Sequence, residues 1–175
     1  MTPDEFIELI GNAAGKVCAD YNLPASVCIA QAALESGWGK YCIGNYNYFG
    51  RKYNGWGDYV VKPAYILFPQ VASKYNGWGD YVVKPAREYI NGEWTTIYAK
   101  FQSYDSLEDA VYDWCVLMAE EPAYRSALQV WHNTWEIGEF VRALAPVYAT
   151  DPDYASKVLS TINANDLMRF DGWND

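Results

Sequence analysis

The chain has 175 residues and a net charge of −9, which suits one domain with a core of its own. The sequence lacks a run of roughly 18 consecutive apolar residues, so we expect no membrane insertion, and the negative charge argues against nucleic acid as a partner. The start, Met-Thr-Pro-Asp-Glu-Phe, shows neither the basic nor the apolar part of a signal peptide. Eight tryptophans and sixteen tyrosines provide rings that can stack on sugars, although most of them are expected in the core.

Cysteine and histidine usage gives no sign of a metal site. The four cysteines are irregularly spaced and His132 is the single histidine, so no metal is expected. We expect no organic cofactor either. Without a signal peptide, reduced thiols are the default for Cys18, Cys28, Cys42 and Cys115. A bridge between Cys18 and Cys28 stays open as an alternative.

Two helices are predicted at the N-terminus. Phe6, Ile10, Ala13 and Val17 share one stripe of an amphipathic helix over residues 3–20. The segment Asn-Leu-Pro then breaks that helix, and the mostly small and apolar residues that follow predict a buried helix over residues 25–36. Glycines directly after it are expected to end this helix, because glycine adopts left-handed geometry at little cost.

Glu35 lies at the C-terminal end of the second predicted helix. Partial loss of hydration and the negative end of the helix dipole both disfavour a carboxylate, so the pKa of Glu35 is expected to rise. A carboxylic acid that is still protonated near neutral pH can act as a general acid. The alternative is an ordinary helix-end glutamate in contact with solvent.

Residues 41–105 have a different composition, rich in Gly, Asn, Tyr and Trp, and predict a β lobe. The stretch from Glu88 to Tyr98 alternates as a hairpin does, with Asn91 and Gly92 supplying a two-residue turn. The lobe contains a tandem duplication: residues 52–64 read KYNGWGDYVVKPA and residues 74–86 repeat all thirteen.

The duplication has an offset of 22 residues and no third copy, so it does not indicate a solenoid. Removing either residues 52–73 or residues 65–86 leaves the same continuous loop-and-hairpin sequence. We interpret the extra segment as an insertion into the lobe. It is either a neutral surface excursion or a longer lip on a binding groove that brings extra Tyr and Trp.

Helices resume after the lobe. Ser106 is predicted to cap a helix that runs to about Glu120 and buries Val111, Trp114, Cys115 and Met118. Thr134 is predicted to cap a helix to about Leu144, and Asp151-Pro152 to begin a last helix to about Phe170. The fold class is therefore α+β, a helical body with a small β lobe in one domain over residues 1–175.

Five motifs occur in this order along the chain: QAALESGWGK, GNYNYFGRK, REYINGEW, AKFQSYDSLEDAVYDW and YATDPDYASKV. Together they resemble the glucosaminidase domain of bacterial autolysins and flagellar muramidase-like proteins, glycoside hydrolase family 73. The resemblance covers roughly residues 3–170 once the duplication is set aside. It implies a lysozyme-like body with an active-site cleft between that body and the β lobe, and hydrolysis of the β-1,4 bond from N-acetylglucosamine to N-acetylmuramic acid in peptidoglycan.

The resemblance also implies roles for individual residues. Glu35 corresponds to the catalytic acid, and Glu88 to a second catalytic glutamate on the hairpin, with Glu93 as its weaker rival. The duplication directly precedes Glu88 and can change how the second carboxyl approaches the first. The residues implied to contact substrate are Asn47, Tyr48, Phe49, Tyr148 and Tyr154, of which Phe49 and Tyr154 can equally serve only packing.

Several alternatives stay open at the level of sequence. Glu88 could act as base on a water in an inverting reaction, as a nucleophile in a retaining one, or only assist the N-acetyl group of the substrate. A muramidase, a lytic transglycosylase and a non-catalytic wall-binding module are the competing functions. We expect a monomer that acts on the cell wall, either as a phage or prophage endolysin or as the catalytic piece of a secreted autolysin.

Overall fold

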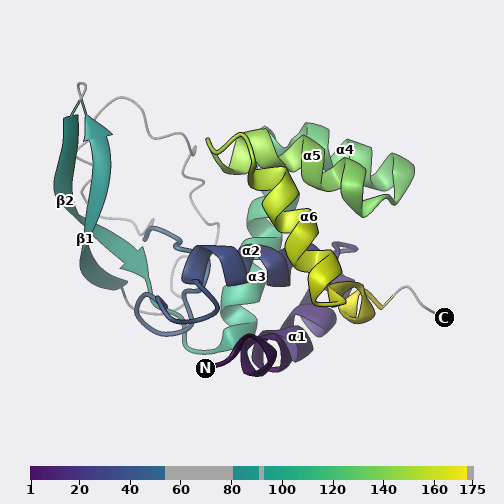
Figure 1. The fold of residues 1–175 in the computed structure, drawn as a ribbon, viewed down its shortest axis with the longest axis horizontal. Helices are drawn as coiled ribbons and strands as arrows, with labels where there is room; N and C mark the ends of the chain where they lie inside the picture. The colour runs from purple at the N-terminus through teal and green to yellow at the C-terminus, as the bar shows by residue number, and fades with distance from the viewer. Residues whose placement is uncertain (54–80, 91–92, 173–175) are drawn as a thin grey trace.

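The structure is a computed structural model that describes residues 1–53, 81–90 and 93–172, without the side chains of residues 86–90. Most of the duplicated segment and the Asn-Gly turn therefore lie outside the described residues. The elements, drawn in Figure 1, are α1 (Pro3–Asp20), α2 (Ala25–Ser36), β1 (Tyr81–Ile90), β2 (Glu93–Gln102), α3 (Leu107–Glu120), η1 (Pro122–Tyr124), α4 (Arg125–Thr134), α5 (Ile137–Tyr148), α6 (Tyr154–Ala164) and η2 (Leu167–Phe170).

The first helix, α1, begins and packs as its sequence predicts. The Thr2 hydroxyl accepts a hydrogen bond from Glu5 N while the Glu5 carboxylate accepts one from Thr2 N, so both ends of a capping box are present. Phe6 and Ile10 are fully buried and Val17 is partly buried. The predicted helix over residues 3–20 and its apolar stripe are confirmed.

Helix α2 is the central helix of the body (Figure 1), in contact with α1, α6 and η2. Every residue from Ala25 to Ala33 is buried, which explains why small side chains are needed there. Gly37 has a φ of 56° and ends the helix in left-handed geometry, as predicted. At the other end, Asp171 Oδ1 accepts a hydrogen bond from Ser26 N at 2.7 Å, so a distant carboxylate caps this helix.

The predicted hairpin is confirmed and is longer than expected. Strands β1 and β2 pair antiparallel from Tyr81 opposite Gln102 to Ile90 opposite Glu93, which leaves two residues for the turn. The hairpin stands to one side of the helices (Figure 1). Its base is joined to residues 51–53, where the first copy of the duplication begins: Tyr53 N donates to Lys100 O at 2.9 Å and Gln102 N to Arg51 O at 3.0 Å.

Helix α3 confirms the prediction for the segment after the lobe. The Ser106 hydroxyl accepts a hydrogen bond from Asp109 N at 3.1 Å and caps the helix, which ends at Glu120. Its four predicted core residues are all fully buried: Val111, Trp114, Cys115 and Met118.

The predicted boundaries of the last helices were partly wrong. Thr134 does not begin a helix; it is the last residue of α4, because Trp135 takes a left-handed conformation with φ 55° and stops the chain there. The next helix, α5, begins at Ile137 and extends to Tyr148. The final predicted helix is two elements, since the left-handed Asp166, with φ 47°, separates α6 from η2.

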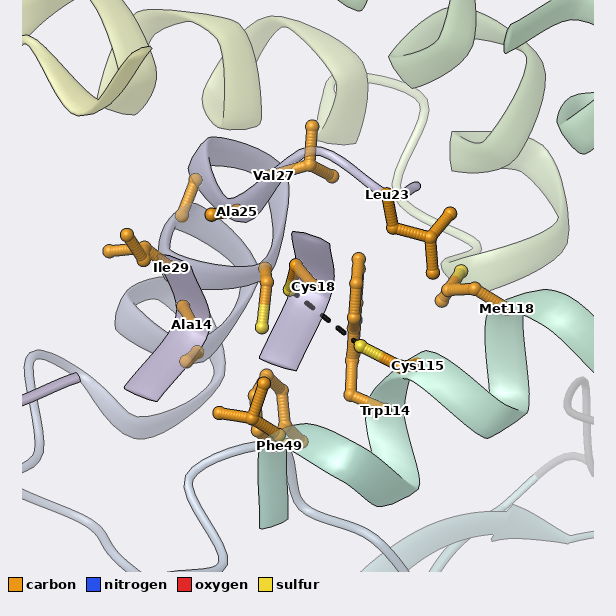
Figure 2. Packing of buried hydrophobic residues seen from close by; sticks show 14 of the residues in the cluster. Ala14, Cys18, Leu23, Ala25, Val27, Ile29, Phe49, Trp114, Cys115 and Met118 are labelled. Atoms are coloured by element: carbon orange, nitrogen blue, oxygen red, sulfur yellow. Dashed lines mark hydrogen bonds between the residues drawn. The ribbon is translucent and has the colours of Figure 1, made fainter. Parts of the chain in front are cut away.

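The described helices and hairpin confirm the α+β class, a mostly helical body with a small β lobe. Figure 2 shows part of the apolar core, in which Trp114 and Cys115 of α3 meet Cys18 of α1. All four cysteines are free thiols, so the Cys18–Cys28 bridge is not formed; Cys115 Sγ lies 3.6 Å from Cys18 Sγ. In the described ranges, no helix is both long and apolar enough to cross a membrane.

Candidate active site

Glu35 lies in the last turn of α2, at the place the sequence predicts. The Glu35 residue as a whole is exposed, yet protein atoms around its carboxyl remove part of the hydration of that group. This loss of hydration raises the pKa of Glu35, and the hydrogen bond from Tyr154 opposes the rise without cancelling it. The predicted direction of the shift is confirmed, with desolvation as its main cause.

Tyr154, the first residue of α6, forms a hydrogen bond to the carboxyl of Glu35. Its hydroxyl donates to Glu35 Oε1 at 3.0 Å, and its ring is buried and stacks on Tyr148 with centroids 5.5 Å apart and planes inclined by 19°. Burial first and the charge of Glu35 second raise the pKa of Tyr154 far above its ordinary value. Tyr154 therefore stays protonated near neutral pH, and its hydroxyl hydrogen is available to Glu35.

Two residues that were not predicted as site residues, Gln31 and Trp114, connect to Tyr154 through hydrogen bonds. Gln31 precedes Glu35 by one turn of α2, and its Nε2 donates to the Tyr154 hydroxyl at 3.3 Å. Its Oε1 accepts a hydrogen bond from Trp114 Nε1, on α3, at 2.8 Å. The only trace of this in the sequence is a glutamine four residues before Glu35 in an otherwise small and apolar helix, and the structure shows that this glutamine is fully buried.

Asn47 organises the loop between α2 and the hairpin. Its Nδ2 donates to Arg51 O and to Gln102 O, both at 2.8 Å, and its Oδ1 accepts from Arg51 N at 2.9 Å. Both ends of this buried amide are therefore engaged within the protein. Asn47 shapes the loop, and its predicted contact with substrate stays a prediction.

Tyr48 and Phe49 are both buried, at 7% and 4% exposure. Tyr48 packs edge-to-face on Phe6, with ring centroids 5.3 Å apart. Phe49 stacks on Trp114 at 6.5 Å, beside the indole that hydrogen-bonds Gln31, and both rings belong to the cluster in Figure 2. The structure thus gives both rings a packing role, and it brings Phe49 to the residues that support Glu35.

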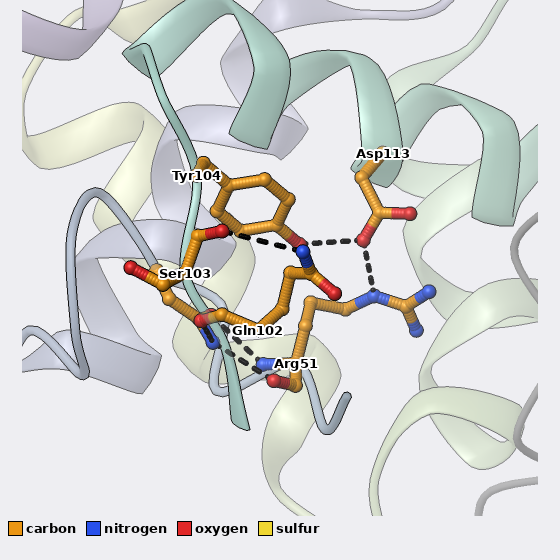
Figure 3. A network of polar contacts seen from close by, with 6 residues as sticks. Arg51, Gln102, Ser103, Tyr104 and Asp113 are labelled. Atoms are coloured by element: carbon orange, nitrogen blue, oxygen red, sulfur yellow. Dashed lines mark hydrogen bonds and ion pairs between the residues drawn. The ribbon is translucent and has the colours of Figure 1, made fainter. Parts of the chain in front are cut away.

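A partly buried ion pair fixes this loop to the body (Figure 3). Arg51 Nε donates to Asp113 Oδ2 at 2.9 Å, and the Tyr104 hydroxyl donates to the same oxygen at 2.6 Å. The negative charge of Asp113 raises the pKa of Arg51 against the opposing effect of burial, so the guanidinium stays charged. The same guanidinium lies within electrostatic range of Tyr148. The sequence analysis did not identify this network.

Glu88 belongs to β1, where its backbone is paired with Thr95. The side chain of Glu88 lies outside the described residues, so its approach to Glu35 stays a prediction. Glu93, the weaker rival, is exposed at the start of β2, as expected for a residue next to the turn.

The chain is similar to known proteins in both sequence and structure. The family profile described as mannosyl-glycoprotein endo-beta-N-acetylglucosaminidase, the glucosaminidase profile, matches residues 11–167. A probable N-acetylmuramidase of Lactococcus lactis is 31% identical over 97% of this chain, and the peptidoglycan hydrolase FlgJ of Escherichia coli is 35% identical over 80%. The catalytic domain of the autolysin Auto of Listeria monocytogenes has 31% identity and a TM-score of 0.77, over 97% of this chain and 87% of that one.

The fold and the profile together define a lysozyme-like glycoside hydrolase. The chain belongs to the glucosaminidase family, glycoside hydrolase family 73, as the resemblance implied. It spans 35% of the length of the Lactococcus relative and 39% of FlgJ, so it corresponds to one domain of those proteins.

Proposed function

We propose that this chain hydrolyses peptidoglycan and cleaves the β-1,4 bond from N-acetylglucosamine to N-acetylmuramic acid. The observation that carries the proposal is Glu35, a solvent-accessible carboxyl whose pKa is raised by loss of hydration and whose Oε1 is held by the buried Tyr154. The names of two relatives, a peptidoglycan hydrolase and a probable N-acetylmuramidase, support peptidoglycan as the substrate.

In the proposed reaction, Glu35 gives its proton to the glycosidic oxygen as the bond to the leaving sugar breaks. Glu88, carried by the hairpin, acts as general base on the attacking water. A separation of roughly 6.5–9.5 Å between the two carboxyls favours inversion, and roughly 5–5.5 Å favours retention. Attack by the N-acetyl group of the substrate, with Glu88 only assisting, is the third route.

Glu35→Gln and Glu88→Gln separate the roles of acid and base, and Glu120→Gln is the control. Glu35→Gln removes the acid proton and is expected to abolish turnover, whereas Glu120→Gln changes an exposed glutamate at the C-terminal end of α3 and should keep wild-type activity. Glu88→Gln should cost at least about tenfold in kcat if it is the base. A smaller loss would reject the two-carboxylate scheme and leave Glu35 as the acid.

The cleaved bond is decided by the products. Purified peptidoglycan is digested with the protein, reduced with borohydride and analysed by mass spectrometry, with Glu35→Gln and Glu120→Gln alongside. Reduced N-acetylglucosamine ends support the proposal. Reduced N-acetylmuramic acid ends identify a muramidase, the activity named for the Lactococcus relative, and anhydro ends identify a lytic transglycosylase.

Binding without fragments would favour a wall-binding module instead of an enzyme. We also propose that the domain acts on the cell wall as a monomer. It works either as a phage or prophage endolysin or as the catalytic domain of a secreted autolysin. Sedimentation of the purified chain tests the monomer, since a dimer would double the mass of 19.9 kDa.

A further inference from the structure

Trp114, Gln31 and Tyr154 form a single chain of hydrogen bonds that ends on Glu35. The indole Nε1 lies 2.8 Å from Gln31 Oε1, Gln31 Nε2 lies 3.3 Å from the Tyr154 oxygen, and that oxygen lies 3.0 Å from Glu35 Oε1. Three helices contribute, α3, α2 and α6, and the three supporting side chains are all buried. A polar chain buried this deeply has to be satisfied at each link.

The first link determines the direction of all the others. An indole N–H can only donate, so the Gln31 oxygen has to face Trp114 and the amide NH₂ has to face Tyr154. The opposite amide orientation would place two donors against each other in the core. The Tyr154 oxygen therefore accepts from Gln31, and its own hydrogen is left for Glu35.

We propose that Trp114 and Gln31 are positioning residues that direct the Tyr154 hydroxyl proton to Oε1 of Glu35, so that the acid proton of Glu35 resides on Oε2. Oε1 is already a hydrogen-bond acceptor, and a neutral carboxyl that accepts at one oxygen carries its proton on the other. Neither positioning residue contacts the reacting bond. The use of Oε2 as the proton donor rests on the proposed function, whereas the direction of the hydrogen bonds does not.

The direction of the chain predicts an effect that packing alone does not. Trp114→Phe removes the indole donor that orients the Gln31 amide, so this amide is free to turn and to accept the Tyr154 proton itself. Glu35 then loses the donor that stabilises its charged form, and its pKa should rise further. Gln31→Leu removes the competing acceptor as well, so Tyr154 keeps donating to Glu35 and the pKa should change less.

The test is a carboxyl ¹³C NMR titration of the folded protein, with the Glu35 signal assigned by its loss in Glu35→Gln. We expect Trp114→Phe and Tyr154→Phe to raise the titration midpoint by about half a pH unit or more, and Gln31→Leu by less than half of that shift. Trp131→Phe is the matched control, because it deletes another buried indole N–H, the one that donates to Asn22 O at 2.7 Å. It should leave the midpoint unchanged.

Two outcomes overturn the proposal. One is an unchanged Glu35 midpoint in Trp114→Phe, and the other is a shift in Gln31→Leu as large as in Trp114→Phe, which would reflect lost packing. If Trp114→Phe fails to fold, β-(3-benzothienyl)alanine at position 114 keeps the shape of the indole and removes only the N–H. The titration needs no substrate, so it stands whether or not the chain cleaves peptidoglycan; in an active enzyme, the alkaline limb of kcat/KM should move with the midpoint.

Discussion

Replacing Asp113 with alanine removes the acceptor that Arg51 and Tyr104 share at the base of the β lobe. The Arg51 and Asp113 side chains are 18% and 14% exposed, and the ion-pair distance is 2.9 Å. Arg51 also forms part of the loop to which β2 is bonded, through Gln102 N and Arg51 O. Loss of the pair should therefore lower the stability of the whole domain and loosen the attachment of the hairpin.

The expected magnitude follows from this burial. Deleting one partner of a fully buried pair costs about 3–5 kcal/mol, since a charge is left without compensation. The residual exposure of both side chains admits some screening by water, so we expect about 3 kcal/mol for Asp113→Ala. Arg51→Met keeps the aliphatic stem, and the double variant should recover part of the loss. The coupling free energy of the cycle is expected at about 1.5–3 kcal/mol.

The assay is urea unfolding of the wild type, both single variants and the double variant. The exposed pair Arg142–Glu139, at 3.2 Å with side chains 62% and 59% exposed, provides a matched cycle with an expected coupling below about 0.5 kcal/mol. Raising the salt concentration to about 0.5 M should leave the first coupling nearly unchanged and abolish the second. Equal couplings for the two pairs, or a first coupling that disappears in salt, would refute the reasoning.

Two further predictions concern pH and the duplication. Burial raises the pKa of Asp171, so the contribution of this one carboxyl to stability is lost as pH rises from the ordinary value near 3.8 through the raised one in the folded state. Asp171→Asn keeps an acceptor for Ser26 N, and its stability relative to wild type in urea unfolding should increase between pH 3 and pH 7; a constant difference would reject this account. Deleting residues 65–86 restores a continuous hairpin sequence and, if the duplication is neutral, leaves kcat and KM on peptidoglycan unchanged; a raised KM would instead support the longer lip.

The parts of the fold that depend on local sequence were predictable. Small apolar residues from Ala25 to Ala33, followed by Gly37, determine a buried helix and its end, and this places Glu35. The alternating residues around Asn91-Gly92 predicted the hairpin, and the pairing of β1 with β2 confirms it. Thr134 was misassigned because the same hydroxyl serves two purposes: it donates back to Val130 O and accepts from Glu136 N, so it closes one helix beside the start of the next.

The residues that support Glu35 could not be predicted from spacing alone. Trp114 hydrogen-bonds a residue 83 positions away, and Tyr154 reaches Glu35 across 119 positions. Each of these side chains also suits an ordinary core position, so composition and periodicity do not single them out. Tyr154 was identified through the resemblance, while Gln31 and Trp114 were not, because a buried glutamine becomes informative only when its two partners are known.

The two proposed catalytic carboxyls, Glu35 and Glu88, are held in place by different parts of the fold. Glu35 is held by side chains from three packed helices, so its geometry is present before any substrate binds. Glu88 is on a hairpin whose described attachments to the body lie at its base, around Arg51, Tyr53 and Phe101. If Glu35 is the acid, its geometry is therefore preorganised, whereas the position of Glu88 depends on the attachment of the hairpin. Substitutions at the base of the lobe should lower kcat through Glu88 while leaving the titration of Glu35 unchanged.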